Sequence, residues 1–473
     1  MESKKKKIIG AGIGYTIGNY LIKGLAFLTI PIFARLLETS DYGIYNTYIA
    51  YESIVYIIIG LVLHSSFKNA KYKFLGNFNQ YVSSCILLSA INAAAWLVLI
   101  NVFYHCIGNY LGLERWIVNL LLLHSFGSAL IQYYNAYVGL YYEYAKFLKL
   151  SFLNAGLNII GSIVLILFVY ENTKYYGRII GTAIPVIAIG IYIVIHFFKK
   201  SKPRPHQLMW KFALTYSLPI IPHGISQVIL VQFDRIMISN MVGAVESGIY
   251  SFAYNVYTII QVTGNSLANV WEPWFFEKMH SGDVKAIREK GVVFGVYMLV
   301  FSAILCFIAP EVILILGANK YSESIYCVIP IVIGGYFSFL YVLPCEIEYY
   351  HEKTKYIAMA TSMAAAVNIG LNYICIAKWG YVAAAYTTLV TYLIYFCFHY
   401  FMAKKIEGRY IYSNKHIFLL VAVALIICGI AVLLIDFVFL RWVLAMGTVL
   451  ICILFTEKKY KLFSKVKRDL FES

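Results

Sequence analysis

Charged residues are scarce in this sequence, and their scarcity argues against an ordinary soluble protein. Asp, Glu, Lys and Arg make up 13% of its 473 residues, whereas a soluble domain carries about 25%. The apolar segments also lack the alternation of apolar and polar residues that a membrane β-barrel requires. The nine cysteines lack metal-ligand spacing and an extracellular disulfide framework. What remains is a series of long, continuous apolar segments, and these are typical of membrane-spanning helices.

The apolar segments predict an all-α, polytopic membrane protein with about 14 transmembrane helices. A helix needs about 20 apolar residues to cross roughly 30 Å of hydrocarbon, and little polar sequence separates the last two segments. The predicted spans cover residues 8–35, 44–66, 81–103, 116–137, 148–168, 176–198, 212–237, 248–271, 291–317, 327–347, 357–376, 381–401, 416–433 and 438–455.

Lysine and arginine are unevenly distributed among the loops, and this distribution orients the chain. The formal net charge is +16, which taken alone would suit a nucleic-acid partner. With the amino terminus in the cytoplasm, 30 of the 39 basic residues fall in cytoplasmic tails and loops, six fall outside and three fall within spans. Arg178, at the edge of a span, is counted with the outer loops. This positive-inside pattern predicts a bacterial inner-membrane protein with both termini cytoplasmic and without a nucleic-acid partner.

Short sequence matches about 200 to 210 residues apart indicate an internal repeat. Six spans, an even number, separate the copies, so both halves enter the membrane in the same orientation. We therefore predict a six-helix lobe over residues 1–202, a second over residues 203–403, and an accessory helix pair with a basic cytoplasmic tail over residues 404–473. The matches join Tyr42-Gly43-Ile44-Tyr45 to Ser247-Gly248-Ile249-Tyr250, residues 141–146 to 349–355, and Asn154 with Asn158 to Asn368 with Asn372.

The chain resembles the polysaccharide-biosynthesis flippases, which are O-antigen-type translocases. The likeness begins at Pro31-Ile32-Phe33-Ala34-Arg35-Leu36-Leu37, followed by Asp41-Tyr42-Gly43-Ile44-Tyr45-Asn46. It continues through Asp234-Arg235-Ile236-Met237-Ile238, Glu352-Lys353-Thr354-Lys355, and Gly380 with Ala383-Ala384-Ala385, and so covers roughly residues 10–401. The same superfamily of multidrug, oligosaccharidyl-lipid and polysaccharide exporters holds the multidrug and toxin extrusion (MATE) proteins and the lipid II flippases.

This resemblance implies both a fold and a function. The fold is two six-helix lobes around a central cavity, often with two extra helices. The function is translocation of an undecaprenyl-diphosphate-linked oligosaccharide repeat unit from the cytoplasmic to the outer leaflet by alternating access. That is transport rather than catalysis, and it needs no cofactor besides a coupling Na⁺ or H⁺. A polysaccharide polymerase and a chain-length regulator are candidate partners, alongside membrane lipids.

Basic residues inside the predicted spans are candidates for substrate binding, because charge is expensive in a membrane. Lys23 precedes Arg35 by 12 residues, about 18 Å of helix, which places Lys23 near mid-bilayer. With Arg235, these residues predict a cationic cavity that holds a diphosphate through charge-assisted hydrogen bonds. Glu52, about 12 Å into the second span, is within reach of Lys23. The alternatives are a Lys23–Glu52 pair that only fixes packing, and arginines that extend to the outer interface.

Asp234, Asn368 and Asn372 predict a coupling-ion site. The two asparagines share one helix face, and helical rise places all three residues in the outer half of the bilayer. A carboxylate with amide carbonyls suits a monovalent cation such as Na⁺, and a lone Asp also suits a proton. Some lipid II flippases have a sodium site on these helices, although Asn372 here replaces an acid. The alternative is an interfacial Asp234–Arg235 pair with inter-helix asparagine hydrogen bonds.

Three prolines are hinge candidates. Pro31 in the first span and Pro219 with Pro222 in the seventh lie at related places in the two predicted lobes. Proline removes a backbone hydrogen bond and bends a helix, and bending suits alternating access. A static kink is the alternative.

Two other functions stay open. Cation-coupled multidrug efflux uses the same fold, although the cationic candidates of the first lobe disfavour cationic drugs. A membrane glycosyltransferase or polysaccharide polymerase would need catalytic acids or arginines in a large outer loop. The longest candidate for such a loop, residues 310–323, is short and carries no such cluster.

Overall fold

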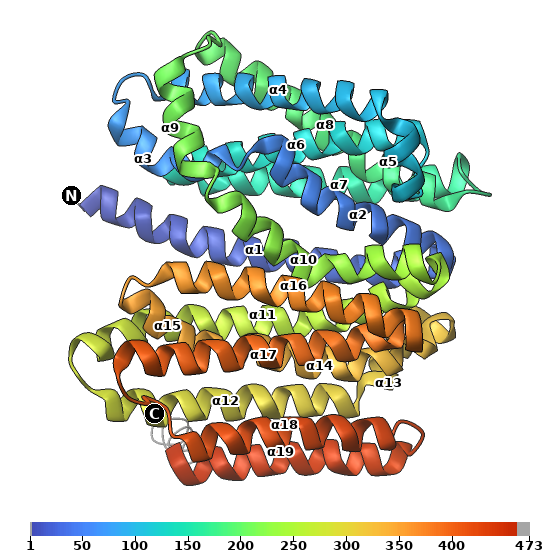
Figure 1. The fold of residues 1–473 in the computed structure, drawn as a ribbon, viewed down its shortest axis with the longest axis vertical. Helices are drawn as coiled ribbons and strands as arrows, with labels where there is room; N and C mark the ends of the chain where they lie inside the picture. The colour runs from blue at the N-terminus through green and yellow to red at the C-terminus, as the bar shows by residue number, and fades with distance from the viewer. Residues whose placement is uncertain (1, 461–473) are drawn as a thin grey trace, which may run out of the picture. The chain divides into compact units, whose positions relative to one another are not determined.

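A computed structural model describes residues 2–460, and no strand forms within that range (Figure 1). The side chains of residues 2–13, 15–17, 19, 107–110 and 458–460 lie outside the description, as does the predicted basic tail beyond residue 460. The elements are α1 (Glu2–Leu36), α2 (Thr39–Gly60), η1 (Leu63–Ser66), α3 (Phe67–Lys73), α4 (Phe78–Val102), α5 (Tyr104–Leu111), α6 (Arg115–Leu140), α7 (Tyr144–Phe168), α8 (Lys174–Lys200), α9 (Gln207–Ser217), α10 (Ile220–Met241), α11 (Ala244–His280), α12 (Val284–Phe307), α13 (Ala309–Gly317), η2 (Ala318–Ser324), α14 (Ile325–Leu340), α15 (Val342–Tyr350), α16 (Thr354–Trp379), α17 (Val382–Glu407), α18 (Asn414–Leu433) and α19 (Val438–Tyr460).

The helices confirm the predicted all-α, multi-pass membrane fold. Among the described residues, ten helical stretches are long and apolar enough to cross a membrane, and two bent pairs raise the number to 12. The two other predicted spans lie on α1 and α11, so the count of 14 stays a prediction. The predicted span 291–317 is divided between α12 and α13. Pro310 lies in the first turn of α13, where its missing N–H is tolerated.

The chain divides into two compact units, Met1–Gly248 and Ile249–Ser473. In the first unit, α8 packs between α6 and α7, and α2 packs against α6 and α10. In the second unit, α17 packs against α14 and α16, and α12 packs against the accessory helices α18 and α19 (Figure 1). The predicted lobes with boundaries at residues 202 and 403 stay a prediction.

Helices α7 and α8 approach each other closely because small residues line their contact. A Cβ atom on Gly181 would lie 2.5 Å from the Cα of Ser162, and one on Gly177 would lie 2.9 Å from the backbone nitrogen of Ile166. Glycines four residues apart form a flat strip on a helix and let a second helix backbone approach. This close approach places the α8 side chain between them, Arg178, within reach of α7.

The turns before α7 and α16 have the same backbone conformation, as the sequence repeat suggests. Tyr142 and Glu352, which lie 210 positions apart, both have a φ of 58°. Two hydrogen bonds recur with the same spacing: the amides of residues 142 and 143 donate to the carbonyls of 139 and 138, and those of 352 and 353 donate to 349 and 348. The repeat is therefore visible in the backbone as well as in the sequence.

Candidate functional site

Arg178 is surrounded by side chains from three other helices of the first unit. Its Nη1 atom donates to Oδ1 of Asn158 at 2.6 Å and to the hydroxyl of Ser162 at 2.8 Å, both on α7. The guanidinium carbon lies 3.7 Å from the ring centroid of Phe33 on α1 and 4.5 Å from that of Tyr45 on α2. A cation over aromatic faces is stabilised electrostatically. One amide oxygen, one hydroxyl and two aromatic rings therefore hold this arginine in place.

The positive charge of Arg178 is not neutralised by an acid. Within the described part of the chain, no carboxylate forms an ion pair with it, and its buried Nε atom has no hydrogen-bond partner. A guanidinium group has five N–H donors, so several donors are free to bind a ligand. Arg178 therefore offers a fixed positive charge, with donors in the fork geometry that suits phosphate.

A cavity of about 160 Å³ lies beside Arg178. Helices α1 and α7 supply most of its lining, and Thr29, Asn158 and Arg178 are its polar residues. A water molecule occupies about 30 Å³ of liquid, so the cavity has room for a phosphate-sized group. Sequence reasoning missed Arg178 because it lies at a span edge. The signals that could have revealed it are the flanking Gly177 and Gly181 and the repeated asparagine at Asn158.

Lys23 and Arg35 project from α1 in different directions. Twelve residues at 3.6 per turn rotate a helix by about 120° beyond whole turns. Lys23 is exposed, and among the described residues it makes neither a hydrogen bond nor an ion pair. Its neighbour Ile22 lines the cavity beside Arg178. Arg35 is exposed, and its Nη1 atom donates to the carbonyl of Pro31 one turn earlier at 3.0 Å.

Asp234 and Arg235 are buried on α10. Asp234 is fully buried and Arg235 is 8% exposed. The Nη1 atom of Arg235 donates to the carbonyl of Val231 at 3.3 Å, and the carbonyl of Arg235 accepts the hydroxyl of Ser247 at 3.2 Å. Burial argues against an Arg235 side chain that extends to the membrane interface.

Asn368 and Asn372 lie on one face of α16, and both are fully buried. Nδ2 of Asn372 donates to Oδ1 of Asn368 at 3.2 Å, and the hydroxyl of Thr387 on α17 donates to Oδ1 of Asn372. Sequence reasoning missed Thr387. Asp234 belongs to the first unit and the asparagines to the second, so their assembly into one ion site stays a prediction.

Glu52 lies at the packed contact of α2 and α6. One turn before it, the hydroxyl of Tyr48 hydrogen-bonds to Nδ1 of His124 at 3.1 Å, and Ser128, one turn after His124, faces the Glu52 carboxylate. The Oε1 atom of Glu52 is buried without a hydrogen-bond partner. No ion pair joins Glu52 to Lys23 among the side chains that the structure describes.

The two copies of the repeated glycine motif meet in the first unit. A Cβ atom on Gly43 would lie 1.8 Å from the carbonyl oxygen of Ala244, and one on Gly248 would lie 1.9 Å from that of Thr39. Beside this contact, the hydroxyls of Thr47 and Ser247 hydrogen-bond at 3.1 Å. The contact therefore tolerates only glycine at both positions, because the obstructing atoms belong to the backbone.

Two of the three predicted hinge prolines lie at a helix bend. Pro219 precedes α10 and Pro222 lies in its first turn, and α9 and α10 meet there at 43°. Pro31 lies within the continuous helix α1. A sharper bend of 53° separates α2 from η1 and α3, at residues 61 and 62, which have φ angles of 51° and 50°. That bend has no proline or glycine at its centre, and the sequence does not predict it.

The fold matches those of solved membrane transporters. The protein is similar to the lipid II flippase MurJ in an inward-closed conformation, with a TM-score of 0.69, 16% identity, and coverage of 95% of this chain and 99% of MurJ. It is also similar to the inward-facing conformation of a multidrug resistance MATE family transporter of the MOP superfamily, with a TM-score of 0.59, 14% identity, and coverage of 81% of this chain and 98% of the transporter. The predicted resemblance to the MATE and lipid II flippase fold is confirmed.

The chain belongs to the polysaccharide biosynthesis protein family, whose profile matches residues 9–279, more than half of the sequence. It is also 20% identical to "Lsg locus putative protein 1" of Haemophilus influenzae, over 77% of this chain and 90% of that protein. The protein is therefore a multi-pass membrane protein of a polysaccharide biosynthesis family with the fold of lipid and drug transporters.

Proposed function

We propose that the protein is a flippase for an undecaprenyl-diphosphate-linked oligosaccharide repeat unit in the bacterial inner membrane. It moves this lipid from the cytoplasmic to the outer leaflet by alternating access. The family and the fold support transport of a lipid-linked sugar. The observation that carries the proposal is Arg178, a fixed cation that has no acid partner among the described residues and lies beside a phosphate-sized cavity. Such a site suits an anionic headgroup and disfavours the cationic drugs of multidrug efflux.

In this proposal, cationic side chains of the first unit act in sequence on the diphosphate. Lys23 is exposed, free to move, and meets the headgroup first. Arg178 is fixed by α7 and the two rings, and offers a second, preorganised contact. Arg35 and Arg235 extend the cationic surface, and Glu52 limits its net charge. Asp234, Asn368 and Asn372 are the coupling-ion candidates, for Na⁺ or H⁺, and Pro219 with Pro222 and Pro31 are the hinge candidates.

The Gly43–Gly248 contact is the proposed outer closure. Both glycines lie near the start of spans that the basic residues orient outside-to-inside. Alternating access requires that one end of the pathway be closed while the other is open. Glycine has no side chain that must move aside when the contact forms. The contact can therefore close and open with little rearrangement of its surroundings.

Deletion of the gene, followed by analysis of lipid-linked sugars, tests the proposed function. A flippase predicts that a completed repeat unit accumulates on the cytoplasmic face of the membrane. Accumulation on the outer face instead indicates a polymerase, and the absence of any accumulation indicates drug efflux. The face is determined by the access of a membrane-impermeant, sugar-oxidising reagent to the lipid in right-side-out and inverted vesicles.

Lys23→Ala is expected to abolish glycan export while the protein still reaches the membrane. Because no described residue bonds to Lys23, its loss should leave thermal stability unchanged and affect only substrate binding. Lys23→Arg, which keeps the charge, should retain partial export. Lys68→Ala, which removes another exposed lysine of the same unit, is the matched control and should export normally. Wild-type export by Lys23→Ala would remove Lys23 from the binding site.

A further inference from the structure

A histidine and a glutamate form a fully buried pair in the second unit. Nδ1 of His399 on α17 lies 2.6 Å from Oε1 of Glu348 on α15, and both side chains are 0% exposed. An ionisable pair inside a membrane protein is costly and commonly functional. This pair belongs to neither the cationic site nor the coupling-ion candidates described above.

Each member of the pair has a second polar atom that nothing satisfies. Oε2 of Glu348 and Nε2 of His399 are buried and have no hydrogen-bond partner among the described residues. A buried carboxylate oxygen without a donor is destabilising, and more so when the group is charged. A proton on Oε2 converts the carboxylate into a neutral acid and lowers this penalty by removing the buried charge. The short Nδ1–Oε1 contact accounts for one proton, so Oε2 and Nε2 are two open positions for a second.

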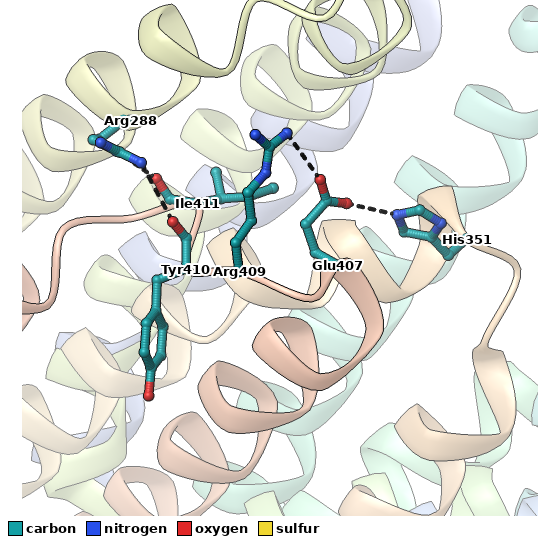
Figure 2. A network of polar contacts seen from close by, with 6 residues as sticks. All are labelled: Arg288, His351, Glu407, Arg409, Tyr410 and Ile411. Carbon is teal, nitrogen blue, oxygen red and sulfur yellow. Dashed lines mark hydrogen bonds and ion pairs between the residues drawn. The ribbon is translucent and has the colours of Figure 1, made fainter.

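A second histidine–glutamate pair joins the C-terminal ends of the same two helices, α15 and α17. Nε2 of His351, which follows α15, lies 2.9 Å from Oε2 of Glu407, near the end of α17, and the side chain of His351 is 34% exposed. Figure 2 shows the Glu407 carboxylate between His351 and Arg409, whose Nη2 atom lies 3.3 Å away. On α17, His399 and Glu407 are eight residues apart, about 12 Å along the helix. One pair is therefore accessible to solvent and the other is buried about two turns inside.

The backbone around the accessible pair is fixed by a separate contact. Arg288 at the start of α12 donates from Nε to the carbonyl of Ile411 at 2.8 Å and from Nη2 to that of Tyr410 at 3.3 Å (Figure 2). These bonds hold the segment that follows Glu407. In the predicted orientation this is the cytoplasmic end of the unit, because it carries Lys404 and Lys405.

Tyrosine, glutamate and cysteine side chains of the neighbouring elements surround the buried pair. The rings of Tyr341, between α14 and α15, and of Tyr395 on α17 lie 5.4 Å and 4.7 Å from the His399 ring. The hydroxyl of Tyr395 hydrogen-bonds to Thr361 of α16. The other titratable groups that interact electrostatically in this part of α15 are Cys345, Glu346 and Tyr349 of α15 itself, Glu272 of α11 and Tyr412 before α18.

Comparison with the first copy of the repeat shows that the fold does not require a charge at position 348. The two matched turns share their hydrogen bonds, and position 348 corresponds to Val138. Val138 is buried and packs in the apolar core of the first unit. A valine therefore satisfies the packing at this place in the turn, and Glu348 has a role other than forming it.

We propose that Glu348 and His399 form a proton-binding site that is loaded from solvent through the His351–Glu407 pair. A hydronium ion gives its proton to the outer pair and leaves water. The proton is passed inward and forms an O–H bond at Oε2 of Glu348. No group is oxidised or reduced. The use of this proton to drive translocation rests on the proposed flippase function, whereas proton binding itself does not.

Infrared difference spectroscopy of the purified full-length protein in lipid nanodiscs tests proton binding without transport. The wild-type protein should show a protonated-carboxyl band whose intensity changes with pH. Glu348→Gln should remove this band, and the matched control Glu289→Gln, which removes an exposed carboxylate of the same unit, should keep it. If Glu348→Gln does not fold, His399→Gln provides the test, because loss of its 2.6 Å contact with Oε1 of Glu348 should change the pH dependence of the band. A wild-type protein without such a band, or a band that survives in Glu348→Gln, would overturn the proposal.

Transport driven by an imposed pH gradient tests the role of the site. In proteoliposomes, Glu348→Gln should reduce gradient-driven flipping of the lipid-linked sugar by roughly tenfold and leave flipping without a gradient largely intact. An unchanged gradient response in Glu348→Gln would overturn the coupling role. Absence of flipping by the wild-type protein would overturn the proposed function and leave proton binding to be decided by the infrared band.

Discussion

Arg178→Gln is expected to abolish or strongly reduce glycan export, by roughly tenfold or more, in a protein that still folds. Glutamine can donate to Asn158 or Ser162, so part of the contact with α7 persists, but the positive charge and the guanidinium fork are lost. Export is measured as surface polysaccharide in a deletion strain that carries each variant. The effect should be on the amount exported, because the proposed site binds the headgroup rather than the sugar.

Three other variants separate the charge of Arg178 from its packing. Arg178→Lys keeps the charge without the fork and should retain partial export. Arg178→Ala removes the hydrogen bonds and the cation–π contacts together and should also lower stability, by about 2–4 kcal/mol. Arg115→Ala is the matched control, since Arg115 also bonds to an asparagine, Asn101, but is exposed and outside the cavity. Normal export by Arg178→Gln at normal stability would contradict the headgroup role.

Gly43→Ala is expected to abolish export by preventing the outer closure. Its methyl group would overlap the carbonyl oxygen of Ala244, at 1.8 Å. The obstructing atom is backbone, so the start of α2 must separate from the segment 244–248. The pathway should then stay open to the outside. A cysteine placed at Thr47, beside the contact, should react faster with a membrane-impermeant thiol reagent in Gly43→Ala than in the parent protein.

Gly156→Ala provides the control for this glycine substitution. Gly156 lies on α7 of the same unit, and nothing lies within 4 Å of a Cβ atom at that position. It should therefore export normally and leave the labelling of Cys at position 47 unchanged. Gly248→Ala should reproduce the phenotype of Gly43→Ala, because its Cβ atom would lie 1.9 Å from the carbonyl oxygen of Thr39. Normal export by both variants would exclude the contact as a closure.

The helices and the repeat could be predicted because both depend on local sequence. Continuous apolar segments dictate helices in lipid, and the matched segments at residues 141–146 and 349–355 share one turn conformation, with Tyr142 and Glu352 in the left-handed region. The pairing of Asn368 and Asn372 on one face followed from helical periodicity alone. The 53° bend after α2 was not predicted, since its central residues, Leu61 and Val62, are neither proline nor glycine.

Only the positive charge of the candidate site could be predicted, and not the residue that carries it. The sequence predicts a cationic cavity formed by Lys23, Arg35 and Arg235, because these basic residues lie within predicted spans. Arg178 lies one turn from a helix start and resembles a loop residue until α1, α2 and α7 are placed around it. The buried pair of His399 and Glu348 was missed for a related reason. Its members are 51 residues apart in the sequence, and neither belongs to a sequence pattern that indicates a functional site.

Flipping of a synthetic lipid by the purified protein tests whether the protein is a flippase for a diphosphate-linked lipid. Proteoliposomes that contain a fluorescent undecaprenyl-diphosphate oligosaccharide on one leaflet are treated with an impermeant quencher, and the quenched fraction is followed in time. The account predicts that the wild-type protein moves the lipid to the opposite leaflet, that Arg178→Gln does not, and that the undecaprenyl oligosaccharide without the diphosphate is moved poorly by both. Equal movement of the lipid by protein-free liposomes, or equal transport of the lipid with and without its diphosphate, would contradict it.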